Sequence, residues 1–213
     1  MDSVSGVGVI DKGVAILEAL SDGPLDLADL QRVTGLPRAT AHRLAVALES
    51  HQLVRRDPGG RFCLGFELIR LGRAAADEFP LAELATPALV ALRDLTGESV
   101  QLFVREHDAR RCVVSLQSSH ALQWVVPVGA VLPLGLGSAG KVLGDAVASR
   151  AESVEEREKG VASVSAAVVD RHGTTVAAVS ISGPVERLTR SPWRKFGKAV
   201  TAAAEQVSTA IAR

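Results

Sequence analysis

The sequence contains little cysteine, no net charge and no long uninterrupted apolar run. Its two cysteines, Cys63 and Cys112, lie far apart without the close spacing of metal ligands. We therefore expect two buried thiols of an intracellular protein rather than a disulfide or a metal site. No uncharged stretch reaches the ~18 apolar residues that a membrane-spanning helix needs. The N-terminus lacks the basic and then apolar pattern of a signal peptide, so we expect a cytoplasmic protein.

The 213 residues, 47% hydrophobic and 23% charged, are enough for two small domains with packed cores. A formal net charge of zero argues by itself against nucleic-acid binding. The charge is unevenly distributed, however: residues 1–30 are strongly acidic, whereas residues 31–61 carry six arginines against Glu49 and Asp57. Because phosphates respond to local charge, the second segment is a candidate for contact with nucleic acid.

Residues 27–44 have the pattern of two short helices separated by a glycine turn. Gly35 can take the positive φ that ends the first helix, and Pro37 is tolerated near the start of the second. The second helix has apolar residues at i, i+3, i+4 and i+7, namely Ala41, Leu44, Ala45 and Leu48. The pattern predicts a helix-turn-helix whose second helix presents its N-terminal residues to DNA base edges. These candidate DNA-binding residues are Arg38, Ala39, Thr40, His42 and Arg43.

Two short runs of alternating apolar and polar residues follow around Pro58-Gly59-Gly60, within residues 53–64. They predict a β-hairpin at the position where a winged helix carries its wing. Its arginines, Arg55, Arg56 and Arg61, are candidates for phosphate contacts. Helical hairpins of this composition also occur in protein–protein modules, which leaves protein association as the alternative. The wing at this distance favours DNA binding.

The periodicity further along the chain predicts helices enclosing an antiparallel sheet, which makes an α+β fold rather than alternating βαβ units. The expected helices cover residues 11–20 (capped by Asp11), 66–76, 81–95, 138–147 and 191–212, and the expected strands cover 99–104, 112–117, 124–128, 161–169 and 176–182. We therefore expect a winged helix-turn-helix domain over residues 1–65 and a linker helix over 66–79, which ends at Phe79-Pro80. An α+β effector-binding domain with an antiparallel sheet, similar to GAF or PAS domains, is expected over 80–213.

Several short motifs carry a resemblance that covers nearly the whole chain: LPRATAHRL at 36–44, GRFCLG at 60–65, VGAVLP at 128–133, GSAGK at 137–141 and VSISGP at 179–184. With these motifs the chain resembles the IclR family of bacterial transcription regulators, which join a winged helix-turn-helix to an effector-binding domain through a linker helix. GVGVIDK at 6–12, TGESVQL at 96–102 and EREKGVASVS at 156–165 are similar to an actinobacterial branch that controls amino-acid biosynthesis, leucine especially.

The chain departs from the family pattern after Lys141, where the family has a longer segment before the next strand. Here residues 142–150 lead almost directly into Ala151-Glu152-Ser153. Either the domain is shortened or a loop is missing from the sequence, and any pocket wall drawn from this segment is in doubt.

The glycine-rich stretch at 135–142 is close to two nucleotide-binding motifs, G-x-G-x-x-G and G-x-x-x-x-G-K. Val142 stands where the second motif needs a hydroxyl to bind magnesium, and no βαβ frame surrounds the loop. We therefore expect these glycines to let the chain turn tightly into a helix. None of the five histidines, His42, His51, His107, His120 and His172, has a nearby nucleophile and acid, so we expect surface histidines and no enzyme.

The N-terminus of that helix suggests a site for a small carboxylate effector at Ser138, Ala139 and Gly140. The family resemblance implies that this loop lines the effector pocket together with Ser163, Ser180 and Ser182. Apolar walls are expected from Val128, Leu132, Val161, Val164, Val179 and Ile181. Plain serines on a sheet face are the alternative.

Together these features predict a homodimer, or a dimer of dimers, that binds double-stranded operator DNA and responds to a small metabolite. Leu68, Ile69 and Leu71 of the linker are more apolar than a solvated helix requires, which suggests a packed interface or a contact within one chain. No cofactor and no membrane contact are expected. The alternative function is a small-molecule sensor or enzyme whose N-terminal module mediates protein association only.

Overall fold

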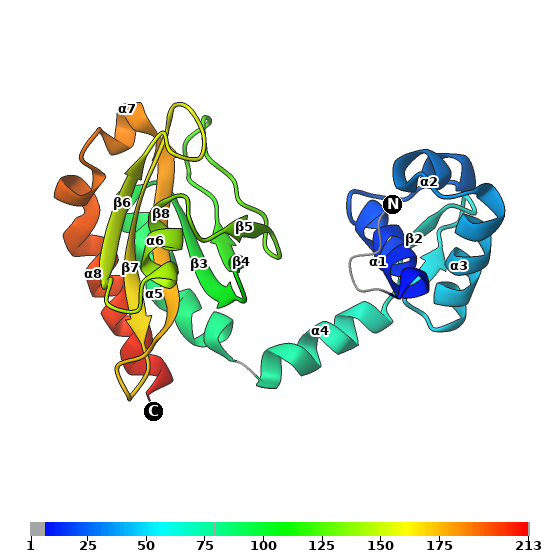
Figure 1. Cartoon of the computed structure of the whole chain (residues 1–213), viewed down its shortest axis with the longest axis horizontal. Helices are drawn as coiled ribbons and strands as arrows, with labels where there is room; N and C mark the ends of the chain where they lie inside the picture. Colours follow the sequence, from blue (N-terminus) through cyan, green and yellow to red (C-terminus); the bar gives the residue numbers. More distant parts are fainter. Residues whose placement is uncertain (1–6, 79, 213) are drawn as a thin grey trace. The chain divides into compact units, whose positions relative to one another are not determined.

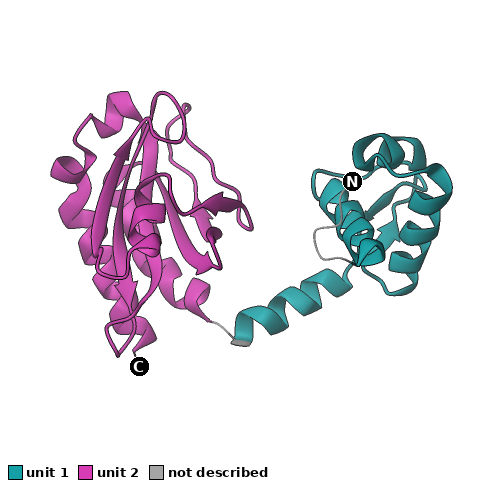
Figure 2. Ribbon diagram, viewed as in Figure 1, with its two compact units in different colours: residues 1–78 teal, residues 79–213 magenta. Residues whose placement is uncertain are grey.

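The structure is a computed structural model that describes residues 7–78 and 80–212, with the side chain of Glu78 left out. It divides into two compact units, residues 1–78 and 79–213 (Figure 2). Each unit has its own apolar core, so each can be described by itself. Phe79, at the end of the expected linker, lies outside the described residues.

The first unit is a winged helix-turn-helix, as predicted (Figure 1). Its elements are α1 (Gly8–Ser21), α2 (Leu27–Thr34), α3 (Arg38–Ser50), β1 (Val54–Arg56), β2 (Phe62–Leu64) and α4 (Glu67–Glu78). Ile16, Leu30, Ala41, Ala45 and Phe62 are almost completely buried and bring the first three helices and the wing together in one core. Burial of this apolar area holds the recognition helix against its supports.

Local signals set the boundaries of α2. The Asp26 side chain accepts a hydrogen bond of 2.8 Å from the Asp29 amide, which caps the helix N-terminus. Gly35 has φ +68° and its amide donates to the Gln31 carbonyl, which closes the C-terminus in the expected left-handed conformation. The expected cap of α1 is wrong: the helix begins at Gly8, so Asp11 lies inside its first turn. An acidic residue there still favours the positive end of the helix dipole.

The wing is tied to the helices at both of its ends. Leu25 and Phe62 exchange two backbone hydrogen bonds of 2.9 and 2.8 Å, which adds a third, bridge-like strand beside β2. The chain leaves the wing at Gly65, where a Cβ would lie 1.9 Å from the carbonyl oxygen of Gln52. Only glycine fits this approach.

The second unit is a six-stranded antiparallel sheet with helices on both faces, which confirms the predicted α+β class (Figure 1). Its helices are α5 (Leu81–Thr96), α6 (Ser138–Gly144), α7 (Val185–Leu188) and α8 (Pro192–Ile211), and its strands are β3 (Ser99–Glu106), β4 (Ala109–Leu116), β5 (Val131–Pro133), β6 (Arg150–Val154), β7 (Val161–Val169) and β8 (Thr175–Pro184). The strand order is β5-β4-β3-β8-β7-β6. Helices α5 and α8 share one core with the sheet, and α6 packs in a second core on the opposite face.

The structure differs from the sequence prediction between the fourth and seventh strands. Residues 124–128 form no strand, because Pro127 begins a turn in which Gly129 takes φ +88° and donates to the Cys112 carbonyl. The strand beside β4 is β5 instead. Helix α6 ends at Gly144 rather than Val147, and five residues connect it to β6, a strand that the sequence did not predict.

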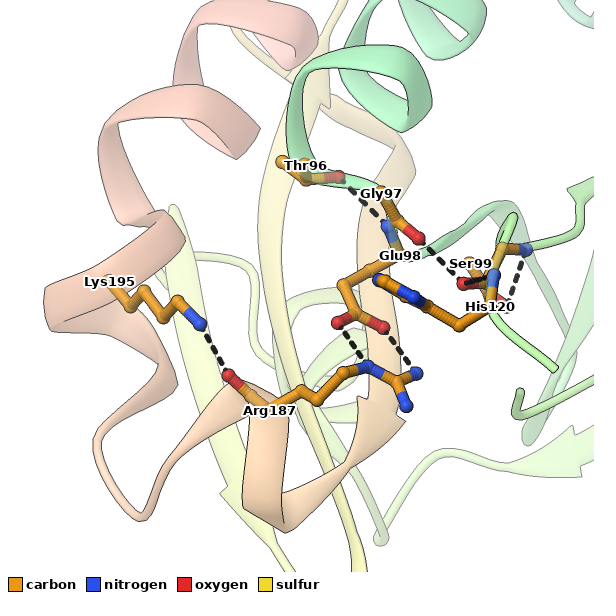
Figure 3. A network of polar contacts seen from close by, with 8 residues as sticks. Thr96, Gly97, Glu98, Ser99, His120, Arg187 and Lys195 are labelled. Atoms are coloured by element: carbon orange, nitrogen blue, oxygen red, sulfur yellow. Dashed lines mark hydrogen bonds and ion pairs between the residues drawn. The ribbon is translucent and has the colours of Figure 1, made fainter. Parts of the chain in front are cut away.

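A buried ion pair fixes α7 to the start of β3 (Figure 3). Glu98 is 2% exposed, and its two carboxylate oxygens accept hydrogen bonds of 2.7 and 2.8 Å from Nε and Nη2 of Arg187. Lys195 at the start of α8 donates to the Arg187 carbonyl at 2.6 Å. This network joins α5, β3, α7 and α8 at one end of the sheet.

Both cysteines are free and buried, as predicted. Burial raises the pKa of the Cys112 thiol to about 11, against a smaller lowering from a hydrogen bond with the backbone of Val114. In the part of the chain that the structure describes, no three His, Cys, Asp or Glu side chains gather as metal ligands. A helix with the length and hydropathy of a membrane span is likewise absent from the described residues.

Candidate functional site

The exposed face of α3 is the first candidate site. Arg38, Ala39, His42 and Arg43 are exposed and Thr40 is half-buried, whereas Ala41 and Ala45 are fully buried in the core of the unit. The ion pairs of the described residues include neither Arg38 nor Arg43. Both guanidinium groups can therefore reach bases or phosphates without giving up a partner in the protein.

The wing arginines have contacts inside the wing. Arg61 forms an ion pair of 2.7 Å with Asp57, and the pKa of Asp57 is held below its usual value by hydrogen bonds from the Arg61 amide and side chain. Arg56 lies 4.1 Å from the ring centre of Phe62 and pairs with Glu49 at 3.3 Å. Arg55 lies over Phe66 at 5.0 Å. All three are exposed, but Arg56 and Arg61 also hold the hairpin together.

The second candidate site is a cavity on the α6 side of the sheet, with about 420 Å³ of space between atoms, its opening included. The structure brings five of the six predicted effector residues to it: Ser138, Ala139, Ser163, Ser180 and Ser182. Gly140 is not in the lining. A Cβ on Gly140 would lie 2.3 Å from both the Leu134 carbonyl oxygen and Nη1 of Arg110, so this glycine allows a close approach of the chain instead.

The serine hydroxyls bind to one another and to the strands. Oγ of Ser138 lies 2.7 Å from Oγ of Ser163 and 2.7 Å from Oγ of Ser165. The Ser138 amide donates to Oγ of Ser163 at 3.4 Å, and Oγ of Ser182 donates to Oε1 of Gln101 at 2.8 Å. Because these groups already have partners and α6 has only seven residues, the helix N-terminus is a weaker anion site than the sequence suggested.

The predicted apolar walls are only partly right. Leu132 and Val161 line the cavity. Val164, Val179 and Ile181 are instead fully buried in the core that the sheet shares with α5 and α8. Each is next to a serine that lines the cavity, and neighbouring residues of a strand face opposite sides of the sheet. Val128 is 64% exposed in the turn before β5.

Polar and aromatic residues that the sequence did not predict also line the cavity, above all Arg110, Arg157, Gln101, Trp124 and Phe103. Arg110 is 3% exposed; its Nη1 donates to the carbonyls of Pro133 and, at 2.7 Å, Leu136. Burial, and then the charge of Arg157, lowers the pKa of Arg110 to about 10. Burial also lowers the pKa of Arg157, an effect that Glu158 opposes. Arg110 lies at a buried position of β4 but before residue 112, where the predicted strand begins, so its segment resembled a solvated turn.

The glycine-rich stretch has the structural role expected of it. Gly137 has φ +79° and forms the N-cap of α6, so the chain turns there into the helix. The sheet around it is antiparallel throughout, which excludes a dinucleotide-binding βαβ unit at this loop. All five histidines are exposed, as predicted.

Comparison with known proteins decides the family. Residues 9–58 match the IclR helix-turn-helix domain, and residues 73–153 and 147–209 match the C-terminal domain of the bacterial transcriptional regulator IclR. These matches cover most of the chain. The chain belongs to the IclR family. It is thus a DNA-binding transcriptional regulator of IclR type, with a ligand-binding C-terminal domain.

IclR relatives match over most of their length. The transcriptional repressor IclR of Escherichia coli K12 is 25% identical, over 94% of this chain and 89% of the relative. The glycerol operon regulatory protein of Streptomyces coelicolor is 32% identical, over 85% and 86%. These relatives point to a regulator rather than an enzyme.

Solved IclR structures have the same fold. The Thermotoga maritima IclR has a TM-score of 0.77 at 20% identity, over 97% of this chain and 99% of that one. An IclR homolog from Microbacterium hydrocarbonoxydans, complexed with 4-hydroxybenzoate, has a TM-score of 0.80 at 18% identity, over 95% and 98%.

Within the matched region this chain is shorter than the transcriptional repressor IclR of E. coli. The match to the E. coli repressor runs over 243 positions, more than the 213 residues available here, so the relative has additional residues. Residues 145–149 connect α6 to β6. The two pieces of the C-terminal match overlap at residues 147–153, next to this connection.

Proposed function

We propose that this IclR-family protein binds a specific operator as a homodimer and responds to a small carboxylate metabolite of amino-acid metabolism. The observation that carries the proposal is the exposed end of α3, where Arg38, His42 and Arg43 project from a helix whose other face is buried. In this arrangement α3 enters the major groove, and Ala39 and Thr40 approach the bases beside the arginines. A protein at operator DNA acts in the cytoplasm, which is the location we propose.

The two groups of arginines have different roles in this proposal. Arg43, which has no ion pair among the described residues, reads a base edge, whereas Arg55, Arg56 and Arg61 in the wing contact phosphates. A bidentate contact to guanine contributes about 1–3 kcal/mol of discrimination. A phosphate contact strengthens binding to all sequences and increases its dependence on salt.

A homodimer supplies the second half-site. In the described part of the first unit, α4 exposes Ile69 (56%) and Leu71 (44%), with Phe66 (69%) just before it, and α1 exposes Val9 (60%) and Ile10 (57%). Phe66 and Ile69 are three residues apart and so lie on the same side of the chain, and such an exposed apolar pair favours a helix-to-helix interface with a second copy. Leu68 is half-buried within its own chain.

The cavity holds the effector in this proposal, with Ser138, Ala139, Ser163, Ser180 and Ser182 in its wall. The similar structure from Microbacterium, complexed with the carboxylate 4-hydroxybenzoate, supports this class of ligand. The motifs at 6–12, 96–102 and 156–165 support a role in amino-acid metabolism. We propose that residues 1–65 bind DNA, 66–79 link the domains and 80–213 bind the effector.

The test is DNA binding by the full chain. An operator is selected from random-sequence DNA with the purified protein, and its affinity is measured by fluorescence anisotropy between 50 and 200 mM salt, about the range in which phosphate contacts weaken strongly. We expect salt-dependent, sequence-selective binding, and we expect Arg43→Ala to weaken binding to the operator by about 1–3 kcal/mol but binding to random DNA much less. Arg55→Ala is the control and weakens both alike. Absence of DNA binding favours the alternative, a sensor with a protein-association module.

A further inference from the structure

Three buried nitrogen donors without a hydrogen-bond partner lie in the wall of the cavity. Among the described residues, the buried unpartnered side-chain atoms include Nε2 of Gln101, Nε of Arg110 and Nε1 of Trp124, all of which belong to lining residues. Buried donors are nearly always satisfied in folded proteins, because each unpaired one costs about 1–3 kcal/mol. A cavity with several such donors is suited to a ligand rich in acceptor oxygens.

Two guanidinium groups face the same cavity without a carboxylate partner. Every ion pair found among the described residues involves other side chains than Arg110 and Arg157. The one acidic residue in the lining, Glu158, is exposed and directly follows Arg157. Like charges close together in a partly buried space are unfavourable unless an anion joins them.

Each guanidinium group is oriented by an aromatic ring. Arg110 lies over Phe103 at 5.4 Å from the ring centre, and Arg157 lies over Trp124 at 5.1 Å. Both hydrogen bonds of Arg110 use Nη1, which directs its Nε–Nη2 edge away from the Pro133 and Leu136 carbonyls.

Another arginine of this chain binds a carboxylate through its Nε–Nη2 edge. Nε and Nη2 of Arg187 hold the two oxygens of the Glu98 carboxylate at 2.7 and 2.8 Å (Figure 3). An Nε–Nη2 edge of an arginine can thus hold one carboxylate, and Nε of Arg110 has no hydrogen-bond partner among the described residues.

We propose that the effector is a compact dicarboxylate, with one carboxylate on Arg110 and the other on Arg157, and with Gln101 and Trp124 donating to its oxygens. This inference rests on the proposed function of the cavity as the effector site. A monocarboxylate would supply one anionic partner to two guanidinium groups, of which only Arg157 has a nearby carboxylate, the exposed Glu158. The enclosed space is small, which favours a compact acid over a large one.

The test compares acids that differ only in the second carboxylate. Malonate, succinate and glutarate are titrated calorimetrically into the full chain beside propionate, butyrate and valerate. We expect the best diacid to bind at least about tenfold more tightly than its monoacid. Arg157→Met should remove this difference without weakening the monoacids. Arg150→Met is the matched control, because Arg150 also lies over a tryptophan, Trp193, at 5.0 Å but outside this cavity.

Several results would overturn the inference. Equal affinities for diacid and monoacid, or an equal loss of both in Arg157→Met, contradict the role of Arg157 as the partner of a second carboxylate. Arg110→Met is a second variant and should weaken both classes. Operator binding is measured in parallel: if monoacids alone bind and change it, the dicarboxylate is wrong but the proposed function stands. If no acid binds to a chain that binds operator, both the dicarboxylate and the effector site are wrong and only DNA binding remains.

Discussion

Loss of the Arg187 side chain should destabilise the second unit more than any surface charge does. Glu98 has a side chain 3% exposed, and both of its oxygens depend on Arg187 (Figure 3). In Arg187→Met the carboxylate stays buried without its counter-charge. Breaking a fully buried pair costs about 3–5 kcal/mol. Because the Arg187 side chain is 26% exposed and water can partly replace it, we expect a loss of about 2–4 kcal/mol.

The assay can report on this unit alone. The only two tryptophans, Trp124 and Trp193, both belong to the second unit, so tryptophan fluorescence during urea unfolding follows that unit. The control is Arg190→Met, because Arg190 is 75% exposed and pairs with Glu155 at the surface. A double variant, Glu98→Gln with Arg187→Met, should recover part of the loss. A loss below about 1 kcal/mol in Arg187→Met, or one no larger than in Arg190→Met, would refute the reasoning.

Three further predictions concern the interface, the cavity and the wing. Ile69→Glu should shift the protein toward monomer in sedimentation velocity, because it places a charge in the proposed interface. The control Leu95→Glu, at an exposed leucine on α5, should not. Equal behaviour of the two variants would place the dimer contact elsewhere. Gly140→Ala should lower the free energy of unfolding in urea by about 1–3 kcal/mol, because the added Cβ would lie 2.3 Å from the Leu134 carbonyl oxygen and from Nη1 of Arg110. The control Gly144→Ala, on the same helix, should be neutral, because its Cβ would make an ordinary contact of 3.7 Å. Hydrogen bonds from Arg61 lower the pKa of Asp57 below its ordinary value of 3.8, so the ionised carboxylate stabilises the wing turn above pH 3.8 and this stabilisation is lost as the pH falls through the lower pKa of the folded state. The NMR amide shifts of Gly59 and Arg61 should therefore titrate with a midpoint below pH 3.8. A midpoint at pH 3.8 or above would contradict the contact.

The first unit was predictable because its signals are local. Gly35 ends α2 and the apolar spacing of α3 selects its buried face, and both are read within a few residues. The wing hairpin follows from its turn residues in the same way. The bridge between Leu25 and Phe62 was missed because it joins segments that are far apart in the sequence.

The second unit contains features that local sequence patterns did not predict. Residues 124–128 are apolar enough for a strand, yet Val126 is buried and Trp124 half-buried in a loop packed with α6, which no alternation pattern reveals. The strand β6 is short and its exposure alternates weakly, so only its pairing with β7 makes it a strand. The serines of β7 and β8, which the family resemblance suggested, lie in the cavity wall, whereas their apolar neighbours were expected there and face the other side of the sheet.

The arginines of the cavity depend on contacts across the fold. Arg110 is held by the carbonyls of Pro133 and Leu136, and Arg157 reaches the cavity from the connection between β6 and β7. In the sequence both stand in polar segments that resemble solvated turns. Only the folded structure brings these two arginines to the same cavity.

The most direct test of the central claim is the operator affinity of the full chain with and without a saturating diacid, with succinate as the first probe. A metabolite-responsive regulator must show a coupling of about 1–3 kcal/mol, a change of roughly 5- to 150-fold in operator affinity. We predict this change for the wild-type chain and its loss in Arg157→Met, which should bind the unliganded operator like the wild type. A diacid that saturates the cavity and leaves operator affinity unchanged would contradict the account.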